Sequence, residues 1–352
     1  MCVPGVRGPS VVSQHVLNPS TGTASTLRGL RGTRVFDISA ASRDIAYAAT
    51  GRGLYETKNA GATWTQILGM PVLALTLDPS APGTLYVAAG AEDLLVRTTN
   101  DGATWCGMGP LPFIDVLALL LDPRVPGTLY ASGNVPSGYR GEVTDNALLK
   151  SMDGGVSWSR TGFLSTGNAT ADDYASGGES FYAMPMALDF ATTSGVYAGF
   201  GFEDAGAQGD ILITADGGAT WHHGESEDIA IDDVDAVASQ PRVAYAAIGD
   251  GGVERTTDEG ASWTLTNGPG HCDTFNGCPV TLSVAVDPAA KGTVFAGTDS
   301  QGLFKTTNRG SSWTRLNVGM SSEVVILAVD PTGSSLFASS GNGLFALPLG
   351  RS

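Results

Sequence analysis

The chain has 352 residues, a formal net charge of −16 at pH 7 and 42% hydrophobic side chains. The negative charge argues against binding to nucleic acid or to anionic membrane surfaces, because a basic surface is needed to neutralise phosphate groups. No apolar run is long enough to cross a bilayer, and the first ten residues lack the apolar region of an export signal. The 48 glycines and the low charge content are typical of short strands and tight turns.

All six tryptophans occupy the last position of one eight-residue pattern, Ser/Thr-x-Asp/Asn-x-Gly-x-Ser/Thr-Trp. We call each copy a tryptophan frame. A hydroxyl, a carboxylate or amide and a glycine at this spacing are the parts of a tight turn, and apolar strands flank each copy. Each frame is therefore predicted to form a β-hairpin tip whose Trp begins the returning strand and packs on a neighbour. The Asp/Asn and Trp positions are, in chain order, Asn59 and Trp64, Asn100 and Trp105, Asp153 and Trp158, Asp216 and Trp221, Asp258 and Trp263, and Asn308 and Trp313.

The frames resemble the Asp-box (BNR) repeat of β-propellers. They recur every 41 to 63 residues, which fits one four-stranded blade per repeat plus insertions. A second repeat, two apolar strands joined by an Asp-Pro turn, precedes most frames, and Asp-Pro is suited to end one strand and begin the bend. Three frames carry Asn in place of Asp, which argues for a role in bracing the turn and against catalysis or metal binding by the frames. The Asp-Pro turns begin at Asp78, Asp122, Asp287 and Asp330.

The predicted fold is all-β: a single, monomeric seven-bladed β-propeller over residues 34–352. The chain ends one strand short of the seventh blade. The segment 1–33 is predicted to donate the missing strand, because closing the ring in this way removes two exposed sheet edges. A loose N-terminal tail is the alternative, and six or eight blades are the alternatives to seven.

The four cysteines give information about the cellular compartment of the protein. Cys272 and Cys278 bracket a short loop that a disulfide would close, which favours an extracellular or periplasmic location. Two free thiols in a cytosolic loop are the alternative. Cys106 follows a frame Trp and is predicted to be a packed thiol. Cys2 would suit a lipoprotein.

Five insertions cluster in blades three to five, and propeller topology places all of them on the face opposite the frames. Loops on a rigid scaffold are the usual seat of binding. Their aromatic rings and carboxylates suit sugar stacking and sugar hydroxyls; the alternative is that many of the aromatics simply anchor long loops. The insertions are 134–146, 161–182, 199–210, 222–235 and 267–279. The ligand-binding candidates are Tyr139, Tyr174, Phe181, Tyr182, Phe200, Phe202, Glu203 and Asp204.

Carboxylates suggest two further sites, the first in the acidic link between blades four and five. Hard oxygen ligands are what Ca²⁺ prefers, although a solvated acidic loop is the alternative and no other cofactor is indicated. Carboxylates near the starts of first strands border the central channel, where an opposed pair would act as general acid and base in glycoside hydrolysis. The calcium candidates are Asp228, Asp232, Asp233 and Asp235, and the catalytic candidates are Asp115, Asp232, Asp233 and Glu323.

The families with Asp-box propellers differ in features that this sequence lacks. Sialidases add an Arg-Ile-Pro motif and clamping arginines, xyloglucan-active endoglucanases join two propellers, and sortilin-type receptors add a cysteine-rich module. Photosystem II assembly factors are single propellers of similar length but carry a basic patch. No functional residue is therefore carried over from any family. The sequence favours an exported bacterial, noncatalytic propeller that binds carbohydrate or a protein partner through the loops of blades three to five. A glycoside hydrolase is the second hypothesis, and a purely structural surface protein the third.

Overall fold

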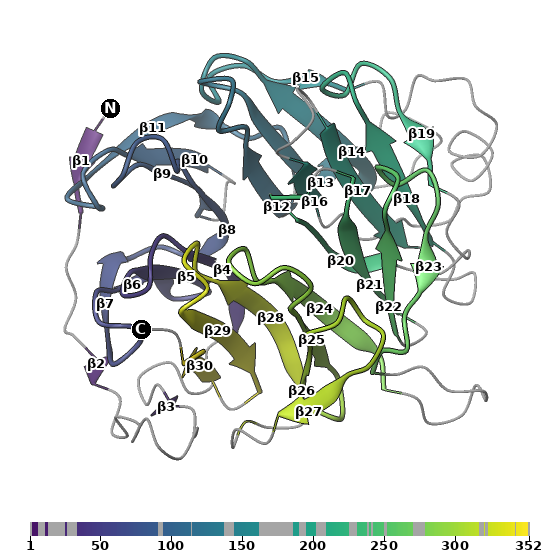
Figure 1. Ribbon diagram of the computed structural model, residues 1–352. Coiled ribbons are helices and arrows are strands. Elements are labelled where there is room, and N and C mark those ends of the chain that lie inside the picture. Colours follow the sequence, from purple (N-terminus) through teal and green to yellow (C-terminus); the bar gives the residue numbers. More distant parts are fainter. Residues whose placement is uncertain are drawn as a thin grey trace.

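The computed structural model consists of seven antiparallel sheets arranged around a common centre (Figure 1). It describes residues 2–5, 11–12, 25–26, 34–90, 94–113, 115–136, 144–161, 186–189, 195–201, 209–224, 231–237, 239–240, 242–249, 252–269, 279–316, 320, 323–341 and 343–350. Within these ranges every regular element is a strand, and no helix is present that would be long and apolar enough to cross a membrane.

Each blade consists of four strands that run in order from the centre of the ring outward. Blade one is β4 (Val35–Ala40), β5 (Ala46–Thr50), β6 (Gly53–Thr57) and β7 (Thr63–Leu68); blade two is β8 (Val72–Leu77), β9 (Leu85–Ala89), β10 (Leu94–Thr98) and β11 (Thr104–Pro110). Blade three is β12 (Asp115–Leu121), β13 (Leu129–Pro136), β14 (Thr144–Ser151) and β15 (Ser159–Arg160); blade four is β16 (Met186–Asp189), β17 (Gly195–Gly201), β18 (Gly209–Thr214) and β19 (His222–His223). Blade five is β20 (Ile231–Ala236), β21 (Ala244–Ile248), β22 (Gly252–Thr256) and β23 (Thr264–Leu265); blade six is β24 (Thr281–Val286), β25 (Val294–Thr298), β26 (Leu303–Thr306) and β27 (Thr314–Leu316). Blade seven is β28 (Val324–Val329), β29 (Ser335–Ser340), β30 (Gly343–Pro348) and β3 (Ser25–Thr26).

The ring is closed at its centre and at its edge. The innermost strands contact one another in the order β4, β8, β12, β16, β20, β24, β28 and back to β4. At the edge, β3 from the N-terminal segment pairs antiparallel with β30 and completes blade seven. The seven-bladed count and the closing N-terminal strand are thus both confirmed. Without β3, blade seven would end on an open sheet edge.

The tryptophan frames all form the predicted hairpin tip between the third and fourth strands. In blade one, Thr57 Oγ1 accepts the backbone N–H of Gly61 at 2.9 Å, and Asn59 Oδ1 accepts that of Thr63 at 2.7 Å. In blade three, Ser151, Asp153 and Ser157 repeat the arrangement, with Asp153 Oδ1 accepting the Ser157 N–H at 2.9 Å. Asn and Asp are interchangeable here because the partner hydroxyl either accepts from the amide, as Thr63 does, or donates to the carboxylate, as Ser157 does.

Each frame also presses against the preceding blade. The frame glycines have positive φ values, for example 91° at Gly155 and 86° at Gly260, which favour glycine. A methyl group at Gly155 would meet Leu95 of blade two at 2.0 Å. The frame tryptophans make similar contacts, since the Trp105 indole N–H donates to the Ile67 carbonyl of blade one. The frames therefore set the spacing between neighbouring blades, and the predicted packing of Trp on a neighbour is confirmed.

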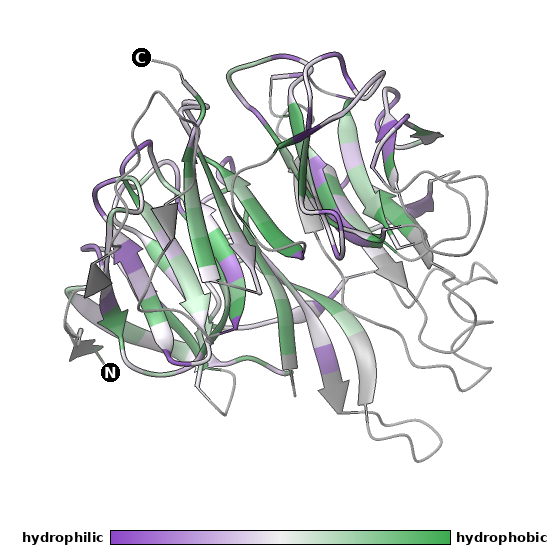
Figure 2. Ribbon diagram, turned by 90° about the horizontal axis from the view of Figure 1, so that it is seen from below, coloured by the Kyte–Doolittle hydropathy of each residue, from purple (hydrophilic) through white to green (hydrophobic). Residues whose placement is uncertain are grey.

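A further repeat, not singled out from the sequence, lies in the second strand of every blade. One buried aromatic ring occupies the same register position in each, and its hydroxyl, where present, can reach the next blade: Tyr130 Oη donates to the Gly217 carbonyl at 3.2 Å. Six of these rings, all but Tyr130, belong to clusters of buried side chains among the described residues, and Figure 2 shows the hydrophobic residues of the strands in green. The seven aromatics are Tyr47, Tyr86, Tyr130, Tyr197, Tyr245, Phe295 and Phe337.

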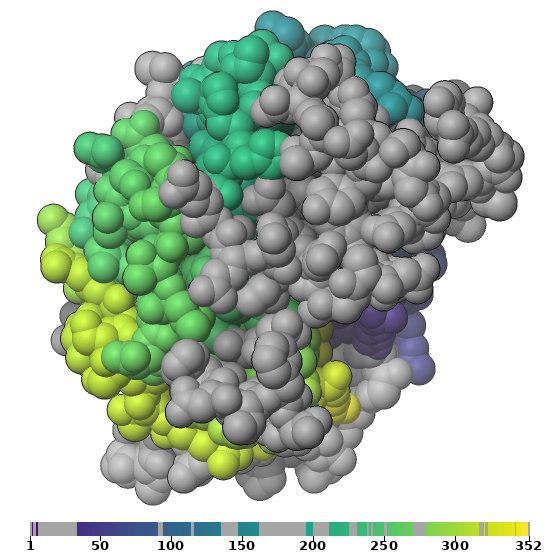
Figure 3. Space-filling model, turned by 90° about the vertical axis from the view of Figure 1, so that its right-hand side faces the viewer, coloured from purple at the N-terminus to yellow at the C-terminus, as the bar shows by residue number. Residues whose placement is uncertain are grey.

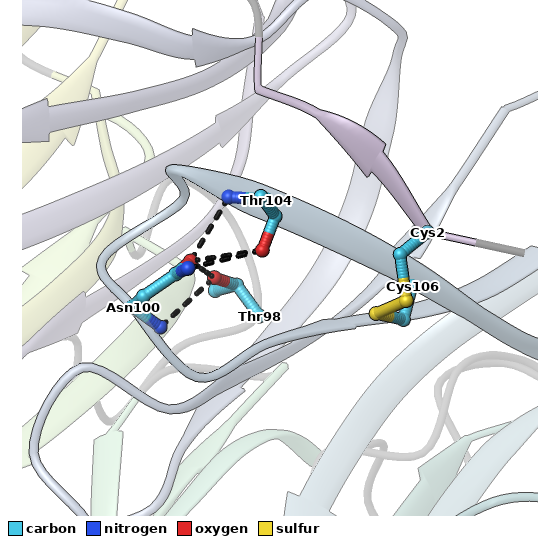
Figure 4. Close-up of a disulfide and its surroundings, with 5 residues drawn as sticks. All are labelled: Cys2, Thr98, Asn100, Thr104 and Cys106. Atoms are coloured by element: carbon cyan, nitrogen blue, oxygen red, sulfur yellow. Dashed lines mark hydrogen bonds between the residues drawn. A yellow bond between two sulfur atoms is a disulfide. The ribbon is translucent and has the colours of Figure 1, made fainter.

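The N-terminal segment contributes three strands to three blades. In addition to β3 on blade seven, β2 (Val11–Val12) pairs with β7 of blade one, and β1 (Cys2–Pro4) pairs with β11 of blade two. The β1–β11 register places Cys2 opposite Cys106, and the two form a disulfide beside the frame of blade two (Figure 4). The prediction of a packed Cys106 thiol is therefore wrong, and Cys2 has its sulfur in this bond instead of on a lipid. The Cys272–Cys278 disulfide stays a prediction because both cysteines lie outside the described residues.

Candidate functional site

The innermost strands of six blades share one irregularity near their first residues. In each, a β-bulge leaves one residue without a partner on the second strand; in blade five, for example, Ile231 pairs with Ile248 and Asp233 with Ala247, which leaves Asp232 out. The bulge lies next to the turn between second and third strands, so it is on the face opposite the frames. We call these six residues the mouth ring: Phe36, Leu73, Leu117, Asp232, Leu282 and Val325.

The mouth ring is apolar apart from one carboxylate. Leu117 and Val325 are both 38% exposed, although each lies on the innermost strand of its blade. Leu73 and Leu282 are half-buried, and Phe36 is half-buried beneath the Arg34 guanidinium, whose Cζ lies 5.6 Å from the ring centroid. Because innermost strands border the channel, these exposed apolar surfaces lie at its opening on the loop face. Exposed apolar side chains at this place suit an apolar ligand group.

Asp232 supplies the charge of the mouth ring. Its side chain is accessible to solvent, yet the protein around the channel removes enough water to raise its pKa to about 7. Desolvation is the resolved cause, so no neighbouring charge accounts for the shift. A carboxyl group that changes charge near neutral pH is able to bind a cation or to donate a proton.

The neighbouring carboxylates have structural roles instead. Asp233 Oδ2 accepts the backbone N–H of Val284 at 2.9 Å, and Asp235 Oδ2 accepts that of Val286 at 2.8 Å. Both bonds tie β20 of blade five to β24 of blade six. Asp37 on β4 makes the same contact with Leu75 of blade two at 2.8 Å. Burial raises the pKa of Asp37 and of Asp235 to about 6 and raises that of Asp233 well above its ordinary value, while the backbone bonds oppose the shift.

The four predicted catalytic candidates lie on three blades. Asp115 is the first residue of β12 in blade three, and Glu323 immediately precedes β28 in blade seven. Asp232 and Asp233 lie on β20 as expected near a strand start, but Asp233 accepts backbone N–H groups with both oxygens, from Val284 and from Val234. Among the candidates on β20, Asp232 is therefore the residue available to a ligand.

The acidic link between blades four and five is largely strand where it is described. Residues 222–223 form β19, and 231–235 belong to β20, so Asp232, Asp233 and Asp235 are not in a solvated loop as the alternative reading expected. Buried Ile231 and Val234 lie three residues apart because of the bulge at Asp232, so the strict alternation that could have revealed the strand is interrupted here. In the described ranges no group of three or more His, Cys, Asp or Glu side chains is placed to hold a metal ion, and Asp228 lies outside them.

The predicted ligand-binding residues fall mostly outside the described ranges. Phe200 lies on β17, opposite Asp210 of β18, so part of the insertion 199–210 extends a hairpin. The insertion 134–146 likewise begins in β13 and ends in β14. The remaining candidates, which lie outside the described residues, are Tyr139, Tyr174, Phe181, Tyr182, Phe202, Glu203 and Asp204.

Comparison with models of known protein families and with curated proteins gave no match. Solved structures do match, and together with the seven sheets they define the class: this chain is a seven-bladed β-propeller. It is similar to YCF48 bound to D1 peptide, with a TM-score of 0.64, 14% identity and coverage of 97% of this chain and 99% of that one. It is also similar to YCF48 from Cyanidioschyzon merolae, with a TM-score of 0.62, 16% identity and coverage of 90% and 96%.

A third similar structure is the GH74 xyloglucanase from Xanthomonas campestris, with a TM-score of 0.70 and 19% identity. The match covers 99% of this chain but 54% of the xyloglucanase, so this chain spans about half the length of that enzyme. At these identities the likeness is one of fold.

Proposed function

We propose that this chain is a noncatalytic binding propeller that takes an extended segment of a protein partner at the mouth ring. The observation that carries the proposal is the composition of the ring: five apolar side chains and one carboxylate occupy equivalent bulge positions around the channel. Such a surface suits a peptide with an apolar side chain for the ring and a basic side chain for Asp232. The net charge of −16 would further attract a basic partner.

Two further observations support the proposal. A similar structure is described as YCF48 bound to a D1 peptide, so a propeller of this fold and length does accept a peptide. The bulges place the ring on the face from which the insertions of blades three to five emerge, and these loops would add contacts to a peptide or, as the alternative ligand, to a carbohydrate. We also infer that the tryptophan frames are Asp-box repeats, because their bonds are those of a braced turn.

An extracellular or periplasmic location is part of the proposal. The disulfide between Cys2 and Cys106 supports it, because such bonds persist in oxidising compartments.

The second candidate is a glycoside hydrolase, favoured by one observation: the pKa of Asp232, raised by desolvation to about 7, suits a general acid. Such an enzyme needs a second carboxylate roughly 5 to 9.5 Å away. Asp233 is held by backbone bonds, so the partner would have to come from another blade, with Asp115 and Glu323 as the candidates. The similarity to a xyloglucanase, about half of whose length matches this chain, is compatible with a glycoside hydrolase.

Parallel peptide and glycan arrays with purified protein test the proposal, followed by a reducing-sugar assay on every glycan that binds. We expect retention of apolar peptides with a Lys or Arg and no sugar release. The variant Leu117→Ser with Val325→Ser should weaken binding at least tenfold, and Asp232→Asn should weaken basic peptides selectively. Glycan turnover that Asp232→Asn abolishes would instead establish the hydrolase.

The matched control is Met152→Ser with Val156→Ser. These side chains are 73% and 61% exposed and lie in the frame of blade three, on the opposite face. The two substitutions remove a similar amount of apolar surface from the face without the mouth ring, so binding should be unchanged. Equal loss of binding in the two double variants would mean that the mouth ring is not the site.

A further inference from the structure

A groove on the outer part of the ring separates blades five and six. It encloses about 330 Å³ and is lined by the end of β22, by β23 and the residues after it, and by the frame of blade six. On the side of the ring that Figure 3 shows, blades five (green) and six (yellow-green) lie next to each other. The groove is built from the frames and outer strands, so it is separate from the mouth ring.

Two arginines and several hydroxyl groups line this groove. Arg255 comes from β22 and Arg309 from the frame of blade six, and they are accompanied by Ser262, Thr264 and Thr266. Leu265 contributes the one large apolar side chain of the lining. The two guanidinium groups and the Thr264 and Thr266 hydroxyls can donate hydrogen bonds, which makes the lining suitable for an anion, whereas the Ser262 hydroxyl donates to Asp258.

Both arginines are held in place by their surroundings. The Arg255 guanidinium lies over the Tyr245 ring, 6.0 Å from its centroid, and its Nε is buried without a hydrogen-bond partner. The Arg309 backbone N–H donates to the Gly292 carbonyl at 2.9 Å, and its side-chain stem lies against Gly292. Burial raises the pKa of Tyr245, and the charges of Arg255 and Arg309 both oppose the rise, so both act close to this hydroxyl.

The carboxylates beside the groove are engaged in other bonds. Asp258 accepts the hydroxyls of Thr256 at 2.8 Å and Ser262 at 2.7 Å within its own frame. Glu259 pairs with Arg242 at 3.4 Å. A buried donor without a partner also lies on the groove: Thr266 Oγ1. Because buried polar groups are normally paired, Thr266 Oγ1 points to a ligand with acceptor oxygens. The unpaired Arg255 Nε does not distinguish this groove, because Arg97 Nε of blade two is unpaired in the same way.

The equivalent interfaces between other blades lack this combination. Arg97 of blade two corresponds to Arg255, but the frame of blade three has Gly154 where blade six has Arg309. Lys150 of blade three donates instead to the Gly217 carbonyl of blade four at 2.8 Å. Among the six frames, that of blade six is the one with a cationic residue at this position. The pair of arginines is thus specific to one interface and not a consequence of the repeat.

We propose that the groove between blades five and six binds a phosphate or sulfate monoester through Arg255, Arg309 and the neighbouring hydroxyls. Guanidinium groups match the oxygens of such tetrahedral anions. The volume exceeds that of the anion alone, so the groove accommodates the small polar group that carries it. This site does not depend on the function proposed for the mouth ring.

Isothermal titration at low salt tests the site with inorganic phosphate and sulfate, then with phosphoserine, O-sulfoserine and serine. We expect saturable binding of the monoesters, tighter than that of the inorganic ions, and none of serine. Arg309→Ala, at an exposed side chain, should weaken binding at least tenfold, and Arg255→Lys should weaken it severalfold. The ratio of phosphoserine to O-sulfoserine affinity identifies the preferred source of the oxyanion.

Two controls separate the site from general electrostatics and from the mouth ring. Arg97→Gln removes a cation at the corresponding position of blade two and should leave anion binding unchanged, as should Asp232→Asn. Absence of saturable monoester binding, or equal loss in Arg97→Gln and Arg309→Ala, would overturn the proposal. Both outcomes are readable without a peptide or glycan ligand, so a failure here leaves the proposed function of the mouth ring separately testable.

Discussion

The Asp or Asn at the third position of each frame illustrates how one side chain holds a hairpin tip. Asn100 Oδ1 accepts the backbone N–H of Thr104 at 2.9 Å and the Thr98 hydroxyl at 3.0 Å, while Nδ2 donates to the Thr104 hydroxyl at 3.0 Å (Figure 4). Asp153 makes the corresponding bonds with two oxygens. The side chain therefore needs one acceptor for the backbone N–H and a second atom that either donates to or accepts from the Ser or Thr hydroxyl before the Trp.

Replacing Asn100 by Ala removes these bonds and leaves the Thr104 N–H to solvent. We expect the free energy of unfolding to fall by about 1 to 2 kcal/mol, as for the loss of a capping side chain. Asn100→Asp, which keeps the Oδ1 acceptor and replaces the Nδ2 donor with a second acceptor for the Thr104 hydroxyl, should change it by less than about 0.5 kcal/mol. Urea unfolding followed by tryptophan fluorescence measures both, and a similar loss in the two variants would contradict this account of the turn.

Asp232 gives peptide binding at the mouth ring a defined pH dependence. Desolvation raises its pKa to about 7, so the carboxylate loses its charge as the pH falls below 7. Affinity for a basic peptide should then decrease by up to about tenfold per pH unit below 7 and level off above it. The other ionisable residues on β20 and on the strands that pack against it are Asp233 and Asp235 on β20, Asp189 on β16, Tyr197 on β17, Asp210 on β18 and Tyr245 on β21.

Titrating the peptide between pH 5.5 and 8.5 by fluorescence anisotropy measures this dependence. In Asp232→Asn the affinity should be low and nearly constant over the same range. A neutral apolar peptide provides the matched ligand control. If the variant retained the pH dependence of the parent, another group would be responsible.

At the scale of strands, much of the fold was predictable because it repeats. The frames recur with little variation, and the Asp-Pro turns form as expected: Asp78 Oδ1 accepts the Ser80 N–H at 2.9 Å, and Asp287 Oδ1 accepts the Ala289 N–H at 3.0 Å. The bulges were not predictable, because an unpaired residue such as Leu117 leaves no mark in the hydrophobic pattern. The groove was not predictable either, since Arg255 and Arg309 meet only when two blades pack side by side.

The N-terminal strands were predictable in part. A missing strand at blade seven required a donor, and β3 is that donor. The pairings of β1 and β2 left no sequence signal, because Cys2 and Cys106 are 104 residues apart and the frame of blade two is complete without a fifth strand. The roles expected for Tyr139 and Cys272 stay predictions, since both positions are outside the described part of the chain.

The disulfide is expected to fasten the N-terminal segment across blades two, one and seven. Cys2→Ser frees β1 from β11 and opens a loop of about 100 residues in the unfolded chain, for which the chain-entropy model gives a loss of about 4 to 5 kcal/mol. We expect a lower Tm for Cys2→Ser than for the parent, and faster amide exchange in β11. Thermal unfolding with and without reductant measures the effect, and Cys106→Ser, which removes the same disulfide, should lower the Tm by a similar amount. Equal Tm values for the parent and both variants would contradict it.

For the whole molecule, the buried inner-strand carboxylates govern how stability varies with pH. Burial raises the pKa of Asp37 and Asp235 to about 6, whereas in the unfolded chain both titrate near 3.8. Between these values the folded state binds more protons than the unfolded state, so their contribution is fully present below pH 4 and is lost as the pH rises through 6. Each shift corresponds to at most about 3 kcal/mol.

At lower pH, the carboxylates of the frames change the free energy of unfolding in the opposite direction. The Ser157 hydroxyl and backbone N–H lower the pKa of Asp153 to about 2, and the Ser262 hydroxyl lowers that of Asp258. Their stabilising contribution is present above about pH 4 and disappears as the pH falls toward 2. The free energy of unfolding should therefore be highest near pH 4 and decrease as the pH rises toward 8, a trend that the growing negative charge reinforces.

Urea unfolding at unit steps from pH 3 to 8 measures this profile, and Asp37→Asn assigns part of it. The amide keeps an acceptor for the Leu75 N–H, which Asp37 accepts at 2.8 Å, and it cannot ionise. The variant should thus match or fall below the parent at pH 4 and exceed it at pH 8. Asp44→Asn removes the same charge at an exposed position and should leave the profile parallel to that of the parent. A parent stability that rises from pH 5 to 7 would show that the inner-strand aspartates are charged in the folded ring.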